Sequence, residues 1–314
     1  MTVDEPAQAT LRLPKGELPR LRRALLAWHG RHGLRAPWRT SGDPYQVLVA
    51  AVMAQQTQMS RVLPKFDEFL AAYPTVEALA RAPTADVLRL WAPLGYNLRA
   101  LRLRRAARRI VREGGFPQTA TELERIEGVG PFTAAIVASF AFGEPVAAVD
   151  TNVRRVVTRL LAGEPAGRVP ERALRQAADG LVAPRASGRW NQAIMDLGAQ
   201  VCTARAPRCD ACPLARWCRA RPLFAATGAP RRVAEAREAY RAQPAFRRSR
   251  RYYRGRIVQA LRELPTGASL APSDLLDRLP DRDGIDEATL LDLVSALRRD
   301  GLVRVVAGGR LRLP

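Results

Sequence analysis

The sequence predicts a mainly α-helical protein that carries a metal-binding loop and ends in a small separate domain. Gly and Pro residues divide the first 222 residues into stretches of helix length, and no run there alternates apolar and polar positions as a strand would. Four cysteines, the only ones in the chain, lie between residues 202 and 218. The residues from 251 to 314 show helical periodicity followed by a hairpin pattern around two glycines.

The first helix is expected over residues 16–34, where leucines recur on one side. A loop at 36–39 separates it from a second helix that Pro44 opens, because proline is favoured in the first turn of a helix. Short helices continue to about residue 222. Residues 1–222 are therefore predicted to form one all-α domain.

After the cysteines the composition changes. Residues 223–250 are polar, contain proline and are rich in arginine, so they are predicted to be a basic linker. Residues 251–314 are predicted to form a winged-helix-like domain, with Ser273 as the N-cap of its second helix. Such domains bind duplex DNA or mediate protein contacts, and the sequence leaves both possibilities open. The helices are expected at 252–264, 273–279 and 287–299, and the hairpin strands at 302–306 and 310–313.

The charge of the chain indicates a polyanionic partner. The net charge is +21 over 314 residues, which favours nucleic acid, although many arginines can also be solvated helix faces. Lys15 and Lys65 are the only lysines, so nearly all the positive charge is arginine. No stretch approaches the roughly 18 apolar residues of a membrane span, and residues 1–10 lack a secretory pattern. A cytoplasmic, nucleoid-associated monomer is expected.

The four cysteines follow the spacing C-x6-C-x2-C-x5-C, which lets one loop close around one metal centre. Four thiolates are the usual ligands of an iron–sulfur cluster, so a [4Fe-4S] cluster is the favoured interpretation. Structural zinc is an alternative, but zinc motifs usually contain two short knuckle pairs and this loop contains one. Disulfides or a lone redox pair are weaker alternatives without a secretory signal. The cluster ligands are predicted to be Cys202, Cys209, Cys212 and Cys218.

A second motif combines a glycine turn with a downstream aspartate. Gly128 and Gly130 suit a tight turn between two helices, where free backbone N–H groups and a helix N-terminus can hold a DNA phosphate. Such a turn alone is weak evidence, because other interhelical turns can contain the same glycine pair. Asp150 follows Thr133 by 17 residues and stands at a helix start, and the combination is much more specific.

These motifs resemble the helix-hairpin-helix (HhH-GPD) DNA glycosylase superfamily, and specifically its MutY branch of adenine DNA glycosylases. The resemblance covers about residues 16–222 in order and implies a two-lobed helical fold that includes the cluster loop. The matching segments are Pro37-Trp38, Pro44-Tyr45, Val52-Met53, Gln55-Gln56-Thr57-Gln58, Leu94-Gly95-Tyr96, Gly128-Val129-Gly130, Val149-Asp150, Asn152-Val153, Asn191-Gln192, Met195-Asp196-Leu197-Gly198-Ala199 and the four cysteines.

The resemblance implies a role for each matched residue. Asp150 corresponds to the catalytic aspartate, whose negative charge is favoured at a helix N-terminus and can stabilise positive charge on the deoxyribose. A plain capping role for Asp150 is compatible with this. Tyr96 corresponds to the aromatic wedge that enters the base stack. The residues expected to contact DNA are Gln55, Gln56, Thr57, Tyr96, Gly128, Gly130, Thr133 and Asn152.

The chain also departs from the family. Ala51 occupies the position of the MutY glutamate that donates a proton to adenine. Phe132 occupies the position of the lysine that attacks the sugar in the endonuclease III branch. Glu127 stands where proline is common, and an acid there is unhelpful beside a phosphate unless it points away. The tail is also too short for the NUDIX-like domain usual in MutY proteins.

The favoured function is therefore a monofunctional DNA glycosylase of base excision repair without lyase activity, with Asp150 as its key carboxylate. Its partner is double-stranded DNA that contains a mismatched or damaged base. Adenine opposite guanine or 8-oxoguanine is favoured by the resemblance. The alternatives are a uracil or thymine mismatch glycosylase, since pyrimidines can leave as anions, and a catalytically degenerate protein that only binds lesions.

Overall fold

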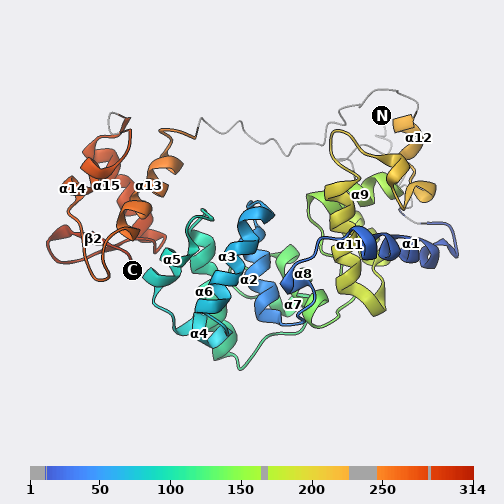
Figure 1. Ribbon diagram of the computed structural model, residues 1–314, viewed down its shortest axis with the longest axis horizontal. Coiled ribbons are helices and arrows are strands. Elements are labelled where there is room, and N and C mark those ends of the chain that lie inside the picture. Colours follow the sequence, from blue (N-terminus) through green and yellow to red (C-terminus); the bar gives the residue numbers. More distant parts are fainter. Residues whose placement is uncertain (1–10, 12, 164–168, 226–245, 282–283) are drawn as a thin grey trace, which may run out of the picture. The chain divides into compact units, whose positions relative to one another are not determined.

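A computed structural model describes residues 11, 13–163, 169–225, 246–281 and 284–314 of the chain. Most of the predicted linker 223–250 lies outside the described residues. The chain divides into two compact units, each built from several separate stretches of the sequence, and Figure 1 labels helices of both. Unit 1 comprises residues 1–48, 117–125 and 129–239, and unit 2 comprises residues 49–116, 126–128 and 240–314.

Unit 1 is built around α11 (Ser187–Gln200), which packs against α1, α8 and α9. Trp190, Ile194 and Leu197 recur at helical spacing and are fully buried, which places an apolar stripe of α11 in the core. The other helices of this unit are α1 (Glu17–His32), α7 (Ala120–Leu123), α8 (Pro131–Ala141), α9 (Thr151–Leu161), α10 (Glu171–Leu181) and α12 (Arg221–Ala225).

Unit 2 is built around α6 (Leu98–Arg112), which packs against α4 and α5. Its buried face contains small and aliphatic residues such as Ala100, Leu103 and Ile110, while several of its arginines remain exposed on the other side. α2 (Pro44–Ala54) begins in unit 1 and continues into unit 2. The neighbouring helices are α3 (Met59–Ala72), α4 (Val76–Arg81) and α5 (Thr84–Trp91).

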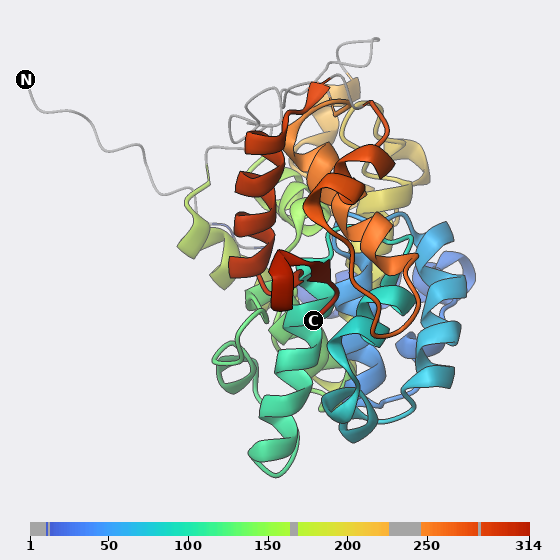
Figure 2. The same cartoon turned by 90° about the vertical axis from the view of Figure 1, so that its left-hand side faces the viewer.

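The C-terminal segment of unit 2 contains three helices followed by a two-stranded antiparallel sheet, drawn in orange and red in Figure 2. Its assignment as an independent winged-helix-like domain stays a prediction. In the sheet, Arg304 pairs with Arg312 and Val305 with Leu311. The elements are α13 (Arg250–Arg262), α14 (Pro272–Arg278), α15 (Glu287–Arg299), β1 (Arg304–Val305) and β2 (Leu311–Arg312).

The predicted cap of α14 is wrong. Ala271 is the N-cap, Pro272 is the first helical residue, and Ser273 lies inside the first turn. Proline is suited to this position because it has no N–H to leave unsatisfied and its φ is already helical. Among the described residues, no helix combines the length and the apolar content needed to cross a lipid bilayer.

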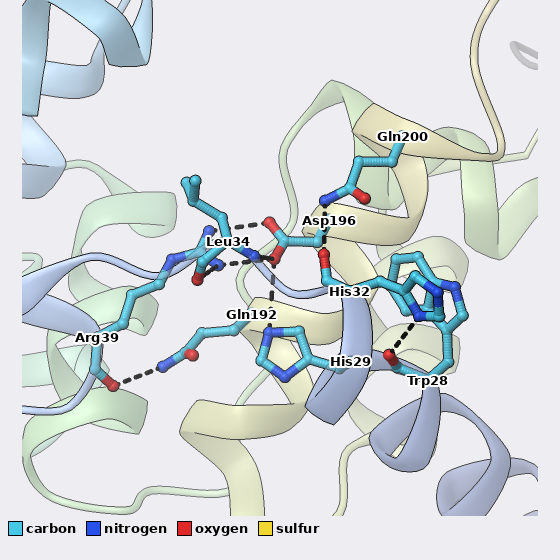
Figure 3. Close-up of polar contacts among 8 residues, drawn as sticks. All are labelled: Trp28, His29, His32, Leu34, Arg39, Gln192, Asp196 and Gln200. Atoms are coloured by element: carbon cyan, nitrogen blue, oxygen red, sulfur yellow. Dashed lines mark hydrogen bonds and ion pairs between the residues drawn. The ribbon is translucent and has the colours of Figure 1, made fainter.

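A buried carboxylate ties α1 and the loop after it to α11 (Figure 3). Asp196 accepts a bidentate pair of hydrogen bonds from Arg39 Nη1 and Nη2, at 2.7 and 2.9 Å. It also accepts the Leu34 backbone N–H at 2.8 Å. His29 Nε2 lies 3.4 Å from Oδ2, in an ion-pair contact without hydrogen-bond geometry. Gln192 of α11 donates to the Arg39 carbonyl oxygen, so the same loop is held twice.

The pKa of Asp196 reflects this network. Burial raises the pKa, but the contacts with His29 and Arg39 and the Leu34 N–H outweigh it and lower the pKa to about 2. A group whose pKa is lowered by folding contributes stability above its ordinary pKa and loses that contribution as the pH falls toward the folded value. The network therefore stabilises unit 1 fully above about pH 4 and loses its effect between about pH 4 and 2.

We expect Asp196→Asn to lower the free energy of unfolding by about 3 kcal/mol at neutral pH, because Arg39 is left buried without an anion. Denaturant unfolding of both proteins between pH 3 and 7 measures this difference, which should narrow toward the acid end. Asp67→Asn changes an exposed aspartate on α3 and serves as the control. An equal loss of stability at every pH would contradict the lowered pKa of Asp196.

Candidate active site and metal centre

Asp150 is the N-cap of α9, as predicted. Its Oδ1 accepts the Val153 backbone N–H at 2.7 Å, and its Oδ2 accepts Asn152 Nδ2 at 3.2 Å. The carboxylate is half-buried and lies at the positive end of the helix dipole. Both oxygens are therefore held in a fixed orientation while the group remains partly accessible.

The first turn of α9 also connects Asp150 to the cysteine loop. Arg155 Nη2 donates to Asn152 Oδ1 and to the Gly198 carbonyl oxygen, each at 2.8 Å, and Arg155 Nε donates to the Cys202 carbonyl oxygen at 2.7 Å. A Cβ at Gly198 would lie 2.7 Å from Asn152 Cβ, so glycine is required for this close approach of α11 to α9. A continuous chain of hydrogen bonds thus runs from the carboxylate to the loop.

The segment before Asp150 is fixed from α11. Asn191 is fully buried; its Oδ1 accepts the Ala148 N–H, and its Nδ2 donates to Ser139 Oγ and to the Val146 carbonyl oxygen. Each of these three hydrogen bonds is between 2.9 and 3.0 Å. A buried amide satisfied in this way fixes the backbone that delivers the aspartate.

The four predicted ligands come together in unit 1. All four cysteine side chains line one pocket, which short 3₁₀ turns η3 (Cys209–Ala211) and η4 (Ala215–Trp217) help to form. Burial raises the pKa of Cys212 to about 12 and also raises the pKa of Cys209 and Cys218; negative charge on neighbouring thiolates adds to each effect. Positive iron ions would remove this mutual repulsion, because metal binding requires and stabilises thiolates.

The cysteine loop can be compared with the requirements of a single zinc ion. A tetrahedral zinc site with bonds of about 2.3 Å needs its sulfurs within about 4 Å of one another. Within the described part of the chain, no three or more His, Cys, Asp or Glu side chains are arranged so that they could hold one metal ion. Four thiols that line one pocket are a ligand set suited to an iron–sulfur cluster.

Arg159, in the last turns of α9, lies against the same pocket. Its Nη1 donates to Cys202 Sγ at 3.4 Å and to the Thr203 carbonyl oxygen at 2.8 Å, and its Nη2 donates to the Ala204 carbonyl oxygen at 3.1 Å. The guanidinium lies 5.0 Å from the Phe224 ring centre and is almost completely buried. α9 is therefore bound to the cysteine loop by Arg155 and Arg159, which lie one helical turn apart.

The glycine turn has the predicted form. Gly128 has a φ of +87°, and a Cβ there would lie 2.7 Å from Arg102 Cβ, so glycine is required. Gly130 is the N-cap of α8, and Pro131 begins the helix. Thr133 is buried, so its predicted DNA contact stays a prediction that only the backbone of the first turn could fulfil. Glu127 forms an ion pair with Arg105 at 2.9 Å, which neutralises the acid beside the turn.

Two loops of unit 2 carry the remaining predicted DNA contacts. Gln55, Gln56 and Thr57 follow α2, and Tyr96 precedes α6 with 52% of its surface exposed. Gln56 and Tyr96 have left-handed φ values of +54° and +46°, which cost about 1–3 kcal/mol each in a residue with a side chain. Such strain persists only where surrounding contacts impose it.

Arg99 supplies those contacts and joins the two loops. Its Nη1 donates to the carbonyl oxygens of Val52 and Met53 at 3.0 and 2.9 Å, and also to that of Gln55. Its Nη2 donates to Thr57 Oγ1 at 3.0 Å and to the Leu94 carbonyl oxygen at 3.1 Å. The guanidinium also contacts the Trp91 and Tyr96 rings, 5.5 and 5.4 Å from their centres. Burial lowers the pKa of Arg99 to about 10, so it remains charged at neutral pH.

The structure thus brings the predicted residues into two groups, one in each unit. Asp150, Asn152 and the cysteines are linked in unit 1, and the two glutamines, Thr57 and Tyr96 are linked in unit 2. Sequence reasoning missed the arginines that make these links. Arg99, Arg155 and Arg159 are buried, but nothing in their sequence distinguishes them from exposed arginines in a chain that contains so many.

Comparison with known proteins agrees with this arrangement. The family described as HhH-GPD superfamily base excision DNA repair protein matches residues 49–180, and the iron–sulfur binding domain of endonuclease III matches residues 202–218. The chain is 38% identical over 298 residues to an adenine DNA glycosylase of Mycobacterium tuberculosis (strain ATCC 25618 / H37Rv), which covers 92% of each protein. It is 39% identical over 218 residues to the Homo sapiens adenine DNA glycosylase, which covers 65% of this chain and 40% of the human protein.

Solved structures show the same fold. A thermostable thymine-DNA glycosylase aligns with a TM-score of 0.60 and 26% identity, over 66% of this chain and 99% of that one. A trapped endonuclease III–DNA covalent intermediate aligns with a TM-score of 0.56 and 22% identity. The alignment covers 68% of this chain and 100% of that one. The predicted helical fold class and the predicted [4Fe-4S] cofactor are confirmed.

We expect anaerobically purified protein to contain about four iron and four sulfide ions per chain. Metal and sulfide analysis of the native protein and of Cys212→Ser measures this, and the variant should lose both because a ligand is removed. Zinc without iron in the native protein would contradict the assignment.

We expect Arg99→Lys to lower the free energy of unfolding by about 2–4 kcal/mol, since one ammonium cannot satisfy the carbonyl oxygens that the guanidinium reaches. Denaturant unfolding measures the loss, and Arg112→Lys, on the exposed end of α6, is the matched control. Equal stability of the two variants would show that Arg99 does not hold these loops.

Proposed function

Because the chain belongs to the HhH-GPD superfamily of base excision DNA repair proteins and is a DNA N-glycosylase, we propose that it releases adenine mispaired with guanine or 8-oxoguanine and leaves the strand uncut. The identity to adenine DNA glycosylases over nearly the whole chain supports adenine. We place this activity on double-stranded DNA in the nucleoid-containing cytoplasm and assign it to a monomer.

The observation that carries the proposal is the orientation of Asp150 at the start of α9. Breaking a glycosidic bond leaves positive charge on the deoxyribose, and a fixed, partly buried carboxylate stabilises that charge better than water does. Asn152 and the Val153 N–H hold the carboxylate, so it need not reorganise during the reaction. The target base must first leave the stack, because its glycosidic bond is inaccessible in a duplex.

The absence of a suitable amine supports a monofunctional reaction. Phe132 stands on α8 where a lyase carries its lysine. Of the two lysines in the sequence, Lys65 is ion-paired with Glu68 on α3, and Lys15 precedes α1. A Schiff base therefore has no obvious nucleophile. The products should be abasic sites in intact strands, and borohydride should trap no covalent complex.

Ala51 favours a second candidate, removal of thymine or uracil from mismatches. Ala51 is buried on α2, and that helix contains no acidic residue that could donate a proton instead. Adenine is a poor leaving group unless it is protonated, whereas a pyrimidine can leave as an anion that hydrogen bonds stabilise. The likeness to a thymine-DNA glycosylase structure agrees with this alternative.

The two candidates respond differently to Ala51→Glu. If adenine is the substrate, a carboxyl placed there should accelerate its release by roughly a hundredfold or more, less the cost of burying the new group. If a pyrimidine is the substrate, the new carboxylate should slow release by repelling the departing anion.

The rates of base release are measured under single-turnover conditions for the native protein and the Ala51→Glu variant. The duplexes contain A:8-oxoG, T:G or U:G pairs. Asp150→Asn controls for contaminating activity. Pyrimidine release by the native protein, with no adenine release from either protein, would reject the adenine assignment. No base release from any duplex would leave a protein that only binds lesions.

A further inference from the structure

The C-terminal segment contacts the loop that carries Tyr96, and both lie in unit 2. Arg262 Nη2, in the last turn of α13, donates a 2.6 Å hydrogen bond to Asn97 Oδ1. Arg89 of α5 donates from Nη2 to the Leu264 carbonyl oxygen at 3.5 Å. A Cβ at Gly301 would lie 3.7 Å from Leu101 Cδ1 of α6. The segment after α13 is thus seated on the helices that flank the loop.

Arg262 is an unusual residue for a contact that serves packing alone. Burial lowers its pKa to about 10, no neighbouring charge offsets that effect, and its Nε has no hydrogen-bond partner. The dipole of α13 favours a positive charge in its last turn but does not require that the charge be buried. An apolar side chain would fill the same space without the cost of desolvating a charge. An apolar side chain could not, however, donate the hydrogen bond to Asn97.

Asn97 is the residue through which this contact reaches Tyr96. It is the N-cap of α6, but its side chain makes no capping hydrogen bond and instead accepts from Arg262. The two residues before it, Gly95 and Tyr96, both have left-handed φ values, +73° and +46°. Holding Asn97 therefore fixes the backbone on the C-terminal side of a strained residue whose ring is half exposed. Arg99 holds the same loop from the other side.

We propose that Arg262 is a positioning residue for Tyr96, and that the C-terminal segment keeps the exposed ring directed for insertion into the base stack. This inference rests on the proposed function, in which Tyr96 is the wedge. It assigns the segment a mechanical role in opening the duplex rather than a role in reading the opposite base. Preorganised groups act faster because they do not pay the ordering cost during the encounter.

The test compares the rate at which native and variant proteins extrude a fluorescent adenine analogue, such as 2-aminopurine, from a mismatched duplex. Arg262→Met keeps the apolar stem of the side chain and removes the hydrogen bond. We expect it to slow the rise in fluorescence roughly tenfold, and Asn97→Ala to do the same from the other partner. Arg298→Ala removes an exposed positive charge from α15 and should have no effect.

A double-variant series separates positioning from general damage. Adding Arg262→Met to Asn97→Ala or to Tyr96→Ala should cause no further slowing, because all three changes act on one element. The proposal would be overturned if Arg262→Met slowed extrusion further in a protein that already carries Tyr96→Ala. It would also be overturned if Arg262→Met alone extruded the analogue at the native rate. A native protein that extrudes the analogue but releases no base would contradict the proposed chemistry and leave this inference standing. A native protein that extrudes nothing would overturn it.

Discussion

The attachment of α9 to the cysteine loop is the constraint on which the rest of unit 1 depends. Arg155 binds the carbonyl oxygen of Cys202, and Arg159 binds the sulfur of the same residue and two carbonyl oxygens after it. Asp150 caps the other end of this helix, so a change in the loop is transmitted to the carboxylate through a rigid element. In the proposed reaction, the cysteine loop therefore supports the helix that carries Asp150.

In unit 2 a buried arginine also holds separate segments together, but there the segments are two loops. Arg99 replaces secondary structure at the point where α2 ends and the loop before α6 begins, because its donors satisfy carbonyl oxygens that have no helical partner. The two loops it joins contain Gln56 and Tyr96, two left-handed residues that would relax without restraint. In the proposed function, Arg99 gives rigid support to the exposed Tyr96 ring that enters the base stack.

The exposed and the buried arginines of the chain thus have different physical roles. Exposed arginines contribute to the net charge of +21, which attracts the DNA backbone without reading its sequence. The buried Arg99, Arg155 and Arg159 do not serve that purpose, because they direct most of their hydrogen bonds to the protein's own carbonyl oxygens. Ala51 adds a constraint of another kind on the proposed release of adenine, since a buried methyl group cannot donate a proton.

The sequence by itself determined the helical fold class, the iron–sulfur cofactor and the capping position of Asp150. These features depend on residue types within short spans: four cysteines on one loop, a glycine turn before a helix, and an aspartate at a helix start. Only the tertiary structure decided how these parts are held. Arg99 reaches Thr57 and Arg155 reaches Cys202 across more than 40 residues of sequence, and most of their acceptors are backbone carbonyl oxygens. Every residue carries such an oxygen, so no pattern of side chains marks it, and only the folded chain selects which ones an arginine meets.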